Sequence, residues 1–231
     1  MFTIRQLFFS VLAIISINAQ AKVIVDTGPS DGNLALNIYD KANGDYQKLA
    51  GNFFLEDSYK VTDIFASIIY YGSSNPNALI NVSVHADQNN KPGESLFSSQ
   101  LTIPATPLTS SYSPDKVFVA HTIEWVGFSN ISLSLNSGSY WIVFSGVQGE
   151  PTDIGWGLFG ATNRLPTYMY MTDSIVGSPP FEILPHTWGD MGGIGAGLKI
   201  IGTPLAVPEP ENLAMLLAGL GLLGVAVPRN K

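Results

Sequence analysis

The alternation of apolar and polar residues over 80–86 constrains the fold of this chain more than any other stretch. A period of two predicts a β-strand with one face in a core and the other in solvent. The expected inward residues are Ile80, Val82, Val84 and Ala86, and the expected outward ones are Asn81, Ser83 and His85. No helical period of useful length occurs between residues 22 and 207, so we expect the body of the chain to consist of strands.

Short runs of the same kind, separated by turn residues, recur along the chain. They predict strands over 22–25, 34–39, 49–55, 59–71, 96–103, 118–125, 131–135, 154–159, 167–171 and 198–201. At the start of 59–71 the alternation sets Tyr59 and Val61 on one face and Ile64 on the other. Residues 139–145 are apolar on both faces, which predicts a central strand covered on both sides. A long polar tip over 87–94 would join two of these strands as a hairpin.

This succession of about a dozen short strands and frequent turns predicts an all-β fold. We expect a single jelly-roll-like β-sandwich over residues 22–203, flanked by an N-terminal signal peptide and a C-terminal transmembrane helix. The sequence has no Cys, which excludes disulfides and thiol catalysis, so a hydrophobic core must stabilise the body. The formal net charge of −7 argues against a nucleic-acid partner.

Residues 1–21 have the three parts of a secretory signal peptide. Arg5 supplies the basic start, residues 7–17 form a short apolar segment, and Ala19 and Ala21 fit the small-x-small cleavage pattern. Cleavage there predicts a mature chain that starts at Lys22. The alternatives are an amphipathic N-terminal helix and a membrane-spanning one, and for the latter the apolar segment is too short.

An uncharged apolar run over 213–227 predicts a transmembrane helix near the C-terminus. The run is shorter than the roughly 20 residues that span a bilayer comfortably, so its polar flanks or a thinned bilayer would make up the difference. Arg229 and Lys231 would stay on the cytoplasmic side. The run could instead be a plain C-terminal anchor helix that is not removed, or a buried hairpin of the globular core. A short marker precedes the run and consists of Val207, Pro208, Glu209 and Pro210.

This order of features resembles the PEP-CTERM sorting signal of bacterial surface proteins. The matching parts are the marker, the Leu- and Gly-rich run 216–223 and the basic end, although the family usually closes with a cluster of arginines. The resemblance implies that residues 204–231 are a sorting signal. It also implies that an exosortase, a membrane protease-transferase, recognises the marker, removes the tail and passes the protein outward. Such signals occur in Gram-negative bacteria that make exopolysaccharide.

The body resembles the choice-of-anchor R domain, which often stands just before PEP-CTERM tails. The matching pieces follow one another in order and are 49–53, 59–64, 87–97, 135–141 and 197–203. That family has no assigned catalytic activity, so the resemblance implies none for this chain.

A search of the sequence for catalytic signatures finds little. The three histidines (His85, His121 and His186) have no close metal-ligand spacing, and no nucleophile elbow, phosphate loop or zinc signature occurs. Paired carboxylates would suit a glycosidase, but the sequence cannot place any two at the required separation. The carboxylate candidates are Glu56, Glu94, Glu124, Glu150 and Glu182. We therefore predict no enzyme activity and no cofactor.

Two loop features point to binding instead. Asp87 begins an Asp-Gln-Asn-Asn tip, a weak calcium candidate because such a site needs about 6–8 oxygens from several elements. A turn with Asx hydrogen bonding is the better interpretation of this tip. Loop aromatic rings could stack on sugars, with packing at the ends of the sandwich as the alternative, whereas Trp141 is expected in the core. The candidate glycan residues are Trp156, Tyr168, Tyr170 and Trp188.

The leading hypothesis is a non-catalytic protein of the cell surface or extracellular matrix. It would cross the inner membrane, contact that membrane transiently, be processed by exosortase and associate with exopolysaccharide. The alternative is a carbohydrate-binding module, with or without calcium. A polysaccharide-acting enzyme ranks last.

Overall fold

The computed structural model describes residues 20–28, 35–41, 43–70, 78–103, 124–148, 154–157, 165–172, 185–190, 196–205 and Gly219. The chain divides into two compact units, Gln20–Thr203 and a second unit made of residues 1–19 and 204–231. The first unit is all-β and carries the strands described below.

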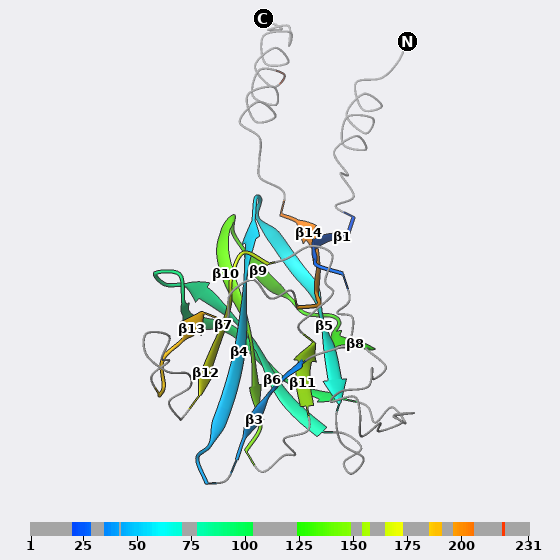
Figure 1. Cartoon of the computed structure of the whole chain (residues 1–231). Helices are drawn as coiled ribbons and strands as arrows, with labels where there is room; N and C mark the ends of the chain where they lie inside the picture. The colour runs from blue at the N-terminus through cyan, green and yellow to red at the C-terminus, as the bar shows by residue number, and fades with distance from the viewer. Residues whose placement is uncertain are drawn as a thin grey trace, which may run out of the picture. The chain divides into compact units, whose positions relative to one another are not determined.

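Two antiparallel sheets pack together in this unit as a β-sandwich (Figure 1). The strands of sheet A are, in order, β1 (Lys22–Asp26), β14 (Leu198–Pro204), β5 (Tyr59–Tyr70), β11 (Ile154–Gly157) and β2 (Ala35–Asn37), with β8 (Glu124–Phe128) and β9 (Leu133–Leu135) also paired to β5. The strands of sheet B are, in order, β13 (Gly189–Asp190), β12 (Tyr168–Thr172), β4 (Tyr46–Leu55), β10 (Gly138–Gly146), β6 (Ala78–Asp87) and β7 (Pro92–Ile103), with β3 (Tyr39–Asp40) also paired to β4. The predicted sandwich class is confirmed.

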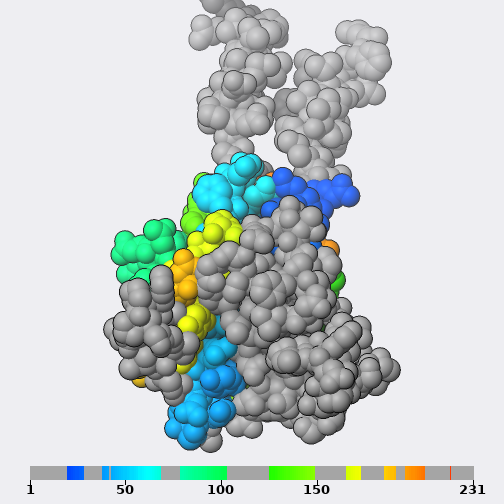
Figure 2. All heavy atoms as spheres, viewed as in Figure 1, coloured from blue at the N-terminus to red at the C-terminus, as the bar shows by residue number. Residues whose placement is uncertain are grey.

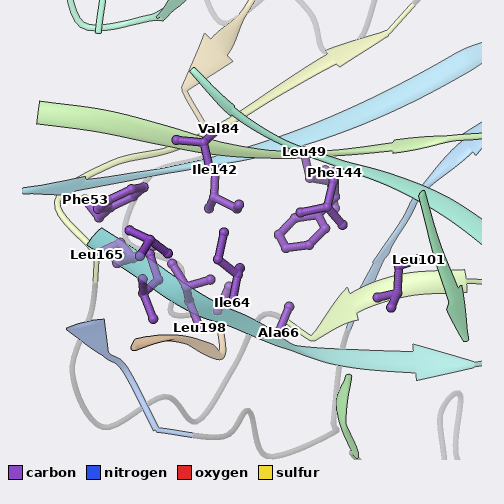
Figure 3. Packing of buried hydrophobic residues seen from close by; sticks show 14 of the residues in the cluster. Leu49, Phe53, Ile64, Ala66, Val84, Leu101, Ile142, Phe144, Leu165 and Leu198 are labelled. Atoms are coloured by element: carbon purple, nitrogen blue, oxygen red, sulfur yellow. The ribbon is translucent and has the colours of Figure 1, made fainter. Parts of the chain in front are cut away.

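The main hydrophobic core lies between the two sheets (Figure 3). Phe53 and Ile142 of sheet B point toward Ile64 and Leu198 of sheet A, and all four are at most 2% exposed. Removing this apolar surface from water is the main favourable term for a chain that has no Cys to cross-link it.

The alternation that predicted β6 is confirmed by burial over 80–84, where the inward residues Ile80, Val82 and Val84 are at most 1% exposed. Ala86, predicted to be inward as well, is only half-buried and lies where the register with β7 shifts. The prediction for 139–145 is confirmed too, because the consecutive residues 141–144 of β10 are all buried. A strand that is buried on both faces needs cover on both faces, which sheet A alone cannot supply.

The predicted single strand over 34–39 is wrong. The segment forms two short strands, β2 in sheet A and β3 in sheet B. Ile38 lies between them, 1% exposed and within the core. The chain therefore passes from one sheet to the other at a residue whose burial was read from sequence as part of one continuous alternation.

The predicted facing of residues at the start of β5 is also wrong. Tyr59, Val61 and Ile64 all lie in the same core cluster, so the alternation shifts by one residue between Val61 and Ile64. At this point β5 changes partner from β9 to β8, and the Ile131 amide donates to the Thr62 carbonyl over 2.8 Å. The change of partner strand accounts for the shift.

The hairpin between β6 and β7 has a tighter turn than the predicted polar tip over 87–94. Only residues 88–91 lie between the two strands. Asn89 and Asn90 have φ values of 55° and 59°, and the backbones of Gln88 and Lys91 bond each other in both directions over 2.9 and 3.2 Å. Two left-handed residues are the geometry that matches the strand twist in a two-residue hairpin loop.

The first and last strands along the chain, β1 and β14, pair with each other, with Lys22 opposite Gly202. Buried Thr27 reinforces the pair, because its Oγ1 accepts from the Leu198 amide over 2.6 Å and donates to the Ala196 carbonyl over 2.7 Å. Among the residues that the structure describes, no helix is long and apolar enough to cross a membrane. The predicted signal peptide and sorting signal lie outside the described residues except for Gln20, Ala21, Pro204, Leu205 and Gly219, and residues 118–123 of the predicted strand 118–125 lie outside them too.

Candidate functional site

The outer face of sheet B, which points away from sheet A, carries the side chains that the core alternation leaves out. A second buried cluster lies on it, formed by Ala50, Trp141, Val143 and Met169. Trp188, just before β13, packs against this cluster. Figure 2 shows β12 (yellow) and β13 (orange) beside each other, and β12 pairs with β4. The middle of the outer face is thus a small core of its own.

Trp141 is the centre of this second core. It is 1% exposed, and its Nε1–H donates to Oδ1 of Asp87 over 2.6 Å. A short bond to a carboxylate oxygen is among the stronger hydrogen bonds in proteins. Trp141 is therefore buried as predicted, but on the outer face rather than between the sheets. Two of the sequence candidates therefore contact this cluster, Asp87 through its bond to Trp141 and Trp188 by packing.

His85 lies beside Trp141 in the register and is held from both ring nitrogens. Its Nδ1 is 2.8 Å from the Gly93 carbonyl oxygen, which can only accept, so Nδ1 carries a proton. Its Nε2 is 2.8 Å from the Ser83 hydroxyl. A hydroxyl, an imidazole and an orienting acceptor in this order match the start of a nucleophile–base arrangement. Sequence placed His85 on a solvated face, and the structure makes it half-buried and doubly bonded.

A serine–histidine pair is not by itself a hydrolytic site. Acyl transfer also requires amide donors aimed at the developing oxyanion. Ser83 lies in an interior strand and pairs with Val143 on one side and Ser98 on the other. The backbone at Ser83 therefore pairs within the sheet, and the bond from His85 to the Gly93 carbonyl joins β6 to β7.

Asn52 and Ser139 form a second polar pair on the outer face. The Asn52 amide donates to the Ser139 hydroxyl over 2.9 Å and to the Tyr140 carbonyl over 3.1 Å. Asn52 is 8% exposed, so these bonds offset the cost of burying its amide. Sequence analysis missed this pair, although the alternation within β4 and β10 would have put both residues on the outer face.

The four candidate glycan residues do not form one platform. Tyr168 is 1% exposed in the core, and its hydroxyl accepts from the amides of Leu165 and Ala196. Tyr170 packs against the same core, and burial raises its pKa. Trp156 lies on β11 in the other sheet, and its side chain is outside the described part of the structure. Of the four, Trp188 is the one that the structure places on the outer face.

The calcium candidate at Asp87 has both carboxylate oxygens engaged. Oδ1 accepts from Trp141, and Oδ2 accepts from the Asn90 amide over 3.4 Å, an Asx contact of the kind that the turn interpretation predicts. Within the described residues, no three His, Cys, Asp or Glu side chains lie close enough to hold a metal ion. His186 is exposed, with its Nδ1 2.6 Å from the Tyr46 hydroxyl.

The remaining sequence candidates are two exposed carboxylates and four residues whose side chains the structure does not describe. Glu56 and Glu94 are exposed, and the side chain of Glu124 is not described. His121, Glu150 and Glu182 lie outside the described residues.

The β6–β7 side of the outer face differs from its middle. It presents groups that are neither acidic nor Lys or Arg, among them Asn81, Ser83, His85, Ser98 and Gln100. Hydroxyl, amide and imidazole groups can both donate and accept, as the hydroxyls of a sugar do. No protein-family model and no curated protein matches the chain. Its function therefore has to be inferred from the chain itself.

Proposed function

We propose that this chain is a non-catalytic protein of the cell surface or extracellular matrix, exported through the inner membrane and processed by an exosortase. In this proposal the sandwich is jelly-roll-like and associates with exopolysaccharide outside the cell. The signal peptide, the sorting signal and the transmembrane helix over 213–227 act before the protein reaches its destination.

The observation that carries the proposal is the position of the first and last strands. β1 begins at Lys22, directly after the proposed cleavage site at Ala21, and β14 ends at Pro204, before the marker at Val207. Removal of residues 1–21 and of the chain from Val207 onward would therefore leave every described strand of the sandwich intact. A signal peptide or sorting signal that is cleaved off must lie outside the folded domain in this way.

Mass spectrometry of the exported protein tests the processing. We expect an N-terminus at Lys22 and a C-terminus upstream of residue 213. Replacing Pro208, Glu209 and Pro210 with Ala should leave the tail in place, whereas Pro228→Ala, on the far side of the apolar run, should not. An exported form that still carries residues 213–227 would refute sorting.

A second candidate function is carbohydrate binding on the β6–β7 side of the outer face. The uncharged hydrogen-bonding groups of that side favour it, and Trp188 supplies an aromatic ring on the same face. Binding of the producing organism's exopolysaccharide should weaken in Asn81→Ala and Gln100→Ala. A glycan array probed with Trp156→Ala and Trp188→Ala tests the aromatic part. Unchanged binding would exclude those rings, and a chelator control would show whether calcium contributes.

A further inference from the structure

Strand β7 forms an edge of sheet B. In the strand order it is last, paired with β6 on one side and with no described strand on the other. It is also long, running over 12 residues from Pro92 to Ile103. An edge of this length presents a row of backbone donors and acceptors that another strand can bind.

Proteins usually protect such edges with charges, Pro or bulges, and on β7 these features gather at its start. Pro92 and Glu94 lie there, and the register with β6 shifts at His85, so that Leu96 has no partner and is 42% exposed. The tip of this hairpin projects at the left of the view in Figure 2 (green). The protective features end before Phe97.

Among the described residues, the second half of β7 is regular and carries none of these protective features. From Phe97 opposite Val84 to Ile103 opposite Ala78, the pairing with β6 runs without a shift. The stretch Phe97–Ile103 contains no charged residue, no Pro and no Gly, in a chain whose formal net charge is −7. A second copy could therefore approach this edge without bringing like charges together.

We propose that β7 is a self-association edge, and that two copies pair antiparallel through Phe97–Ile103 about a two-fold axis at Gln100. With Gln100 at the middle of the stretch, each position meets another position of the same stretch, as an isologous contact requires. Ser98, which is exposed, lies opposite Thr102 of the second copy. Both are on the outer face, because residues two or four apart in a strand share a face.

The pairing would join the two B sheets into one continuous sheet. The uncharged groups of the two outer faces would then lie side by side across the junction. A dimer of this kind offers two copies of the same surface to a repetitive ligand, which raises its avidity. The self-association itself does not depend on export, sorting or ligand binding.

Single cysteine substitutions in the full chain test the contact, because the protein has no other Cys. Directly opposed residues in an antiparallel pair lie within disulfide reach. Gln100→Cys should therefore yield a disulfide-linked homodimer on a non-reducing gel after mild oxidation. Ser98→Cys and Thr102→Cys should each yield little alone, and a mixture of the two should yield the cross-linked heterodimer.

Exposed Ser134 on β9 of sheet A provides the matched control as Ser134→Cys. The proposal is overturned if Gln100→Cys cross-links no more than this control, or if Ser98→Cys alone cross-links as well as the mixture. Gln100→Lys gives an independent measurement. It places two positive charges at the axis and should shift the protein to a monomer in sedimentation velocity, and an unchanged dimer would contradict the assigned register.

Discussion

The middle and the β6–β7 side of the outer face of sheet B follow the same alternation but differ in how deeply their side chains are buried. In the middle, Ala50, Trp141 and Val143 are less than 5% exposed. On the β6–β7 side, Ser83 is half-buried and Ser98 is exposed. The middle is apolar and has Trp188 packed against it, whereas the β6–β7 side is polar. A period of two thus identifies the residues that point away from the main core. Whether these residues are apolar or polar then indicates which of them are buried in the outer cluster and which stay accessible to solvent.

Truncation of Trp141 should give the largest effect. Trp141→Ala removes a fully buried ring and its bond to Asp87, so we expect a loss of about 3–5 kcal/mol in the free energy of unfolding, measured by denaturant titration. The control is Trp125→Ala on β8, a half-buried tryptophan, which should cost clearly less. A loss at Trp141 no larger than at Trp125 would mean that the outer cluster is not a core.

The second-largest loss of stability should follow removal of the Asp87 carboxylate, which accepts the hydrogen bond of Trp141. Asp87→Ala leaves the indole N–H without its acceptor, and we expect a loss of about 1–3 kcal/mol in the same titration. Asp87→Asn keeps an oxygen acceptor and should lose less. Glu94→Ala, at an exposed position close by in the hairpin, should have almost no effect. Equal losses in all three would break the link between the hairpin tip and the outer cluster.

The polar half should respond more weakly. Ser83→Ala removes one hydrogen bond to a half-buried imidazole, so we expect about 0.5–1.5 kcal/mol of destabilisation. Ser98→Ala, at an exposed position opposite Ser83 on β7, should stay within about 0.5 kcal/mol. Thermal or chemical denaturation of the two variants in parallel would measure the difference in stability. A larger loss of stability at Ser98 than at Ser83 would contradict the assignment of Ser83 as the half-buried, hydrogen-bonded residue and Ser98 as the exposed one.

Sequence reasoning succeeded where one strand keeps one environment along its length. The alternation of β6 and the double burial of β10 both followed from residue type alone. It failed where the partner changes within a segment, as at Ile38 between β2 and β3 and at Ile64 within β5. Neither change leaves a local signal, because pairing is decided by strands distant in sequence. For the same reason, the contact between Trp141 and Asp87 could not be predicted from their separate positions.

The smallest effect is expected on β12, whose neighbouring residues face opposite sides of sheet B. Met169 belongs to the outer cluster, and Tyr170 packs against the main core. Burial raises the pKa of Tyr170, so the unfolded chain ionises this phenol first, near pH 10. The contribution to stability is therefore lost as the pH rises above about 10, because the unfolded state then binds fewer protons than the folded state. In Tyr170→Phe, denaturant midpoints between pH 8 and pH 11 should fall less steeply than in the parent. Parallel slopes would show that the phenol of Tyr170 is solvated and that the inner side of β12 is open at this position.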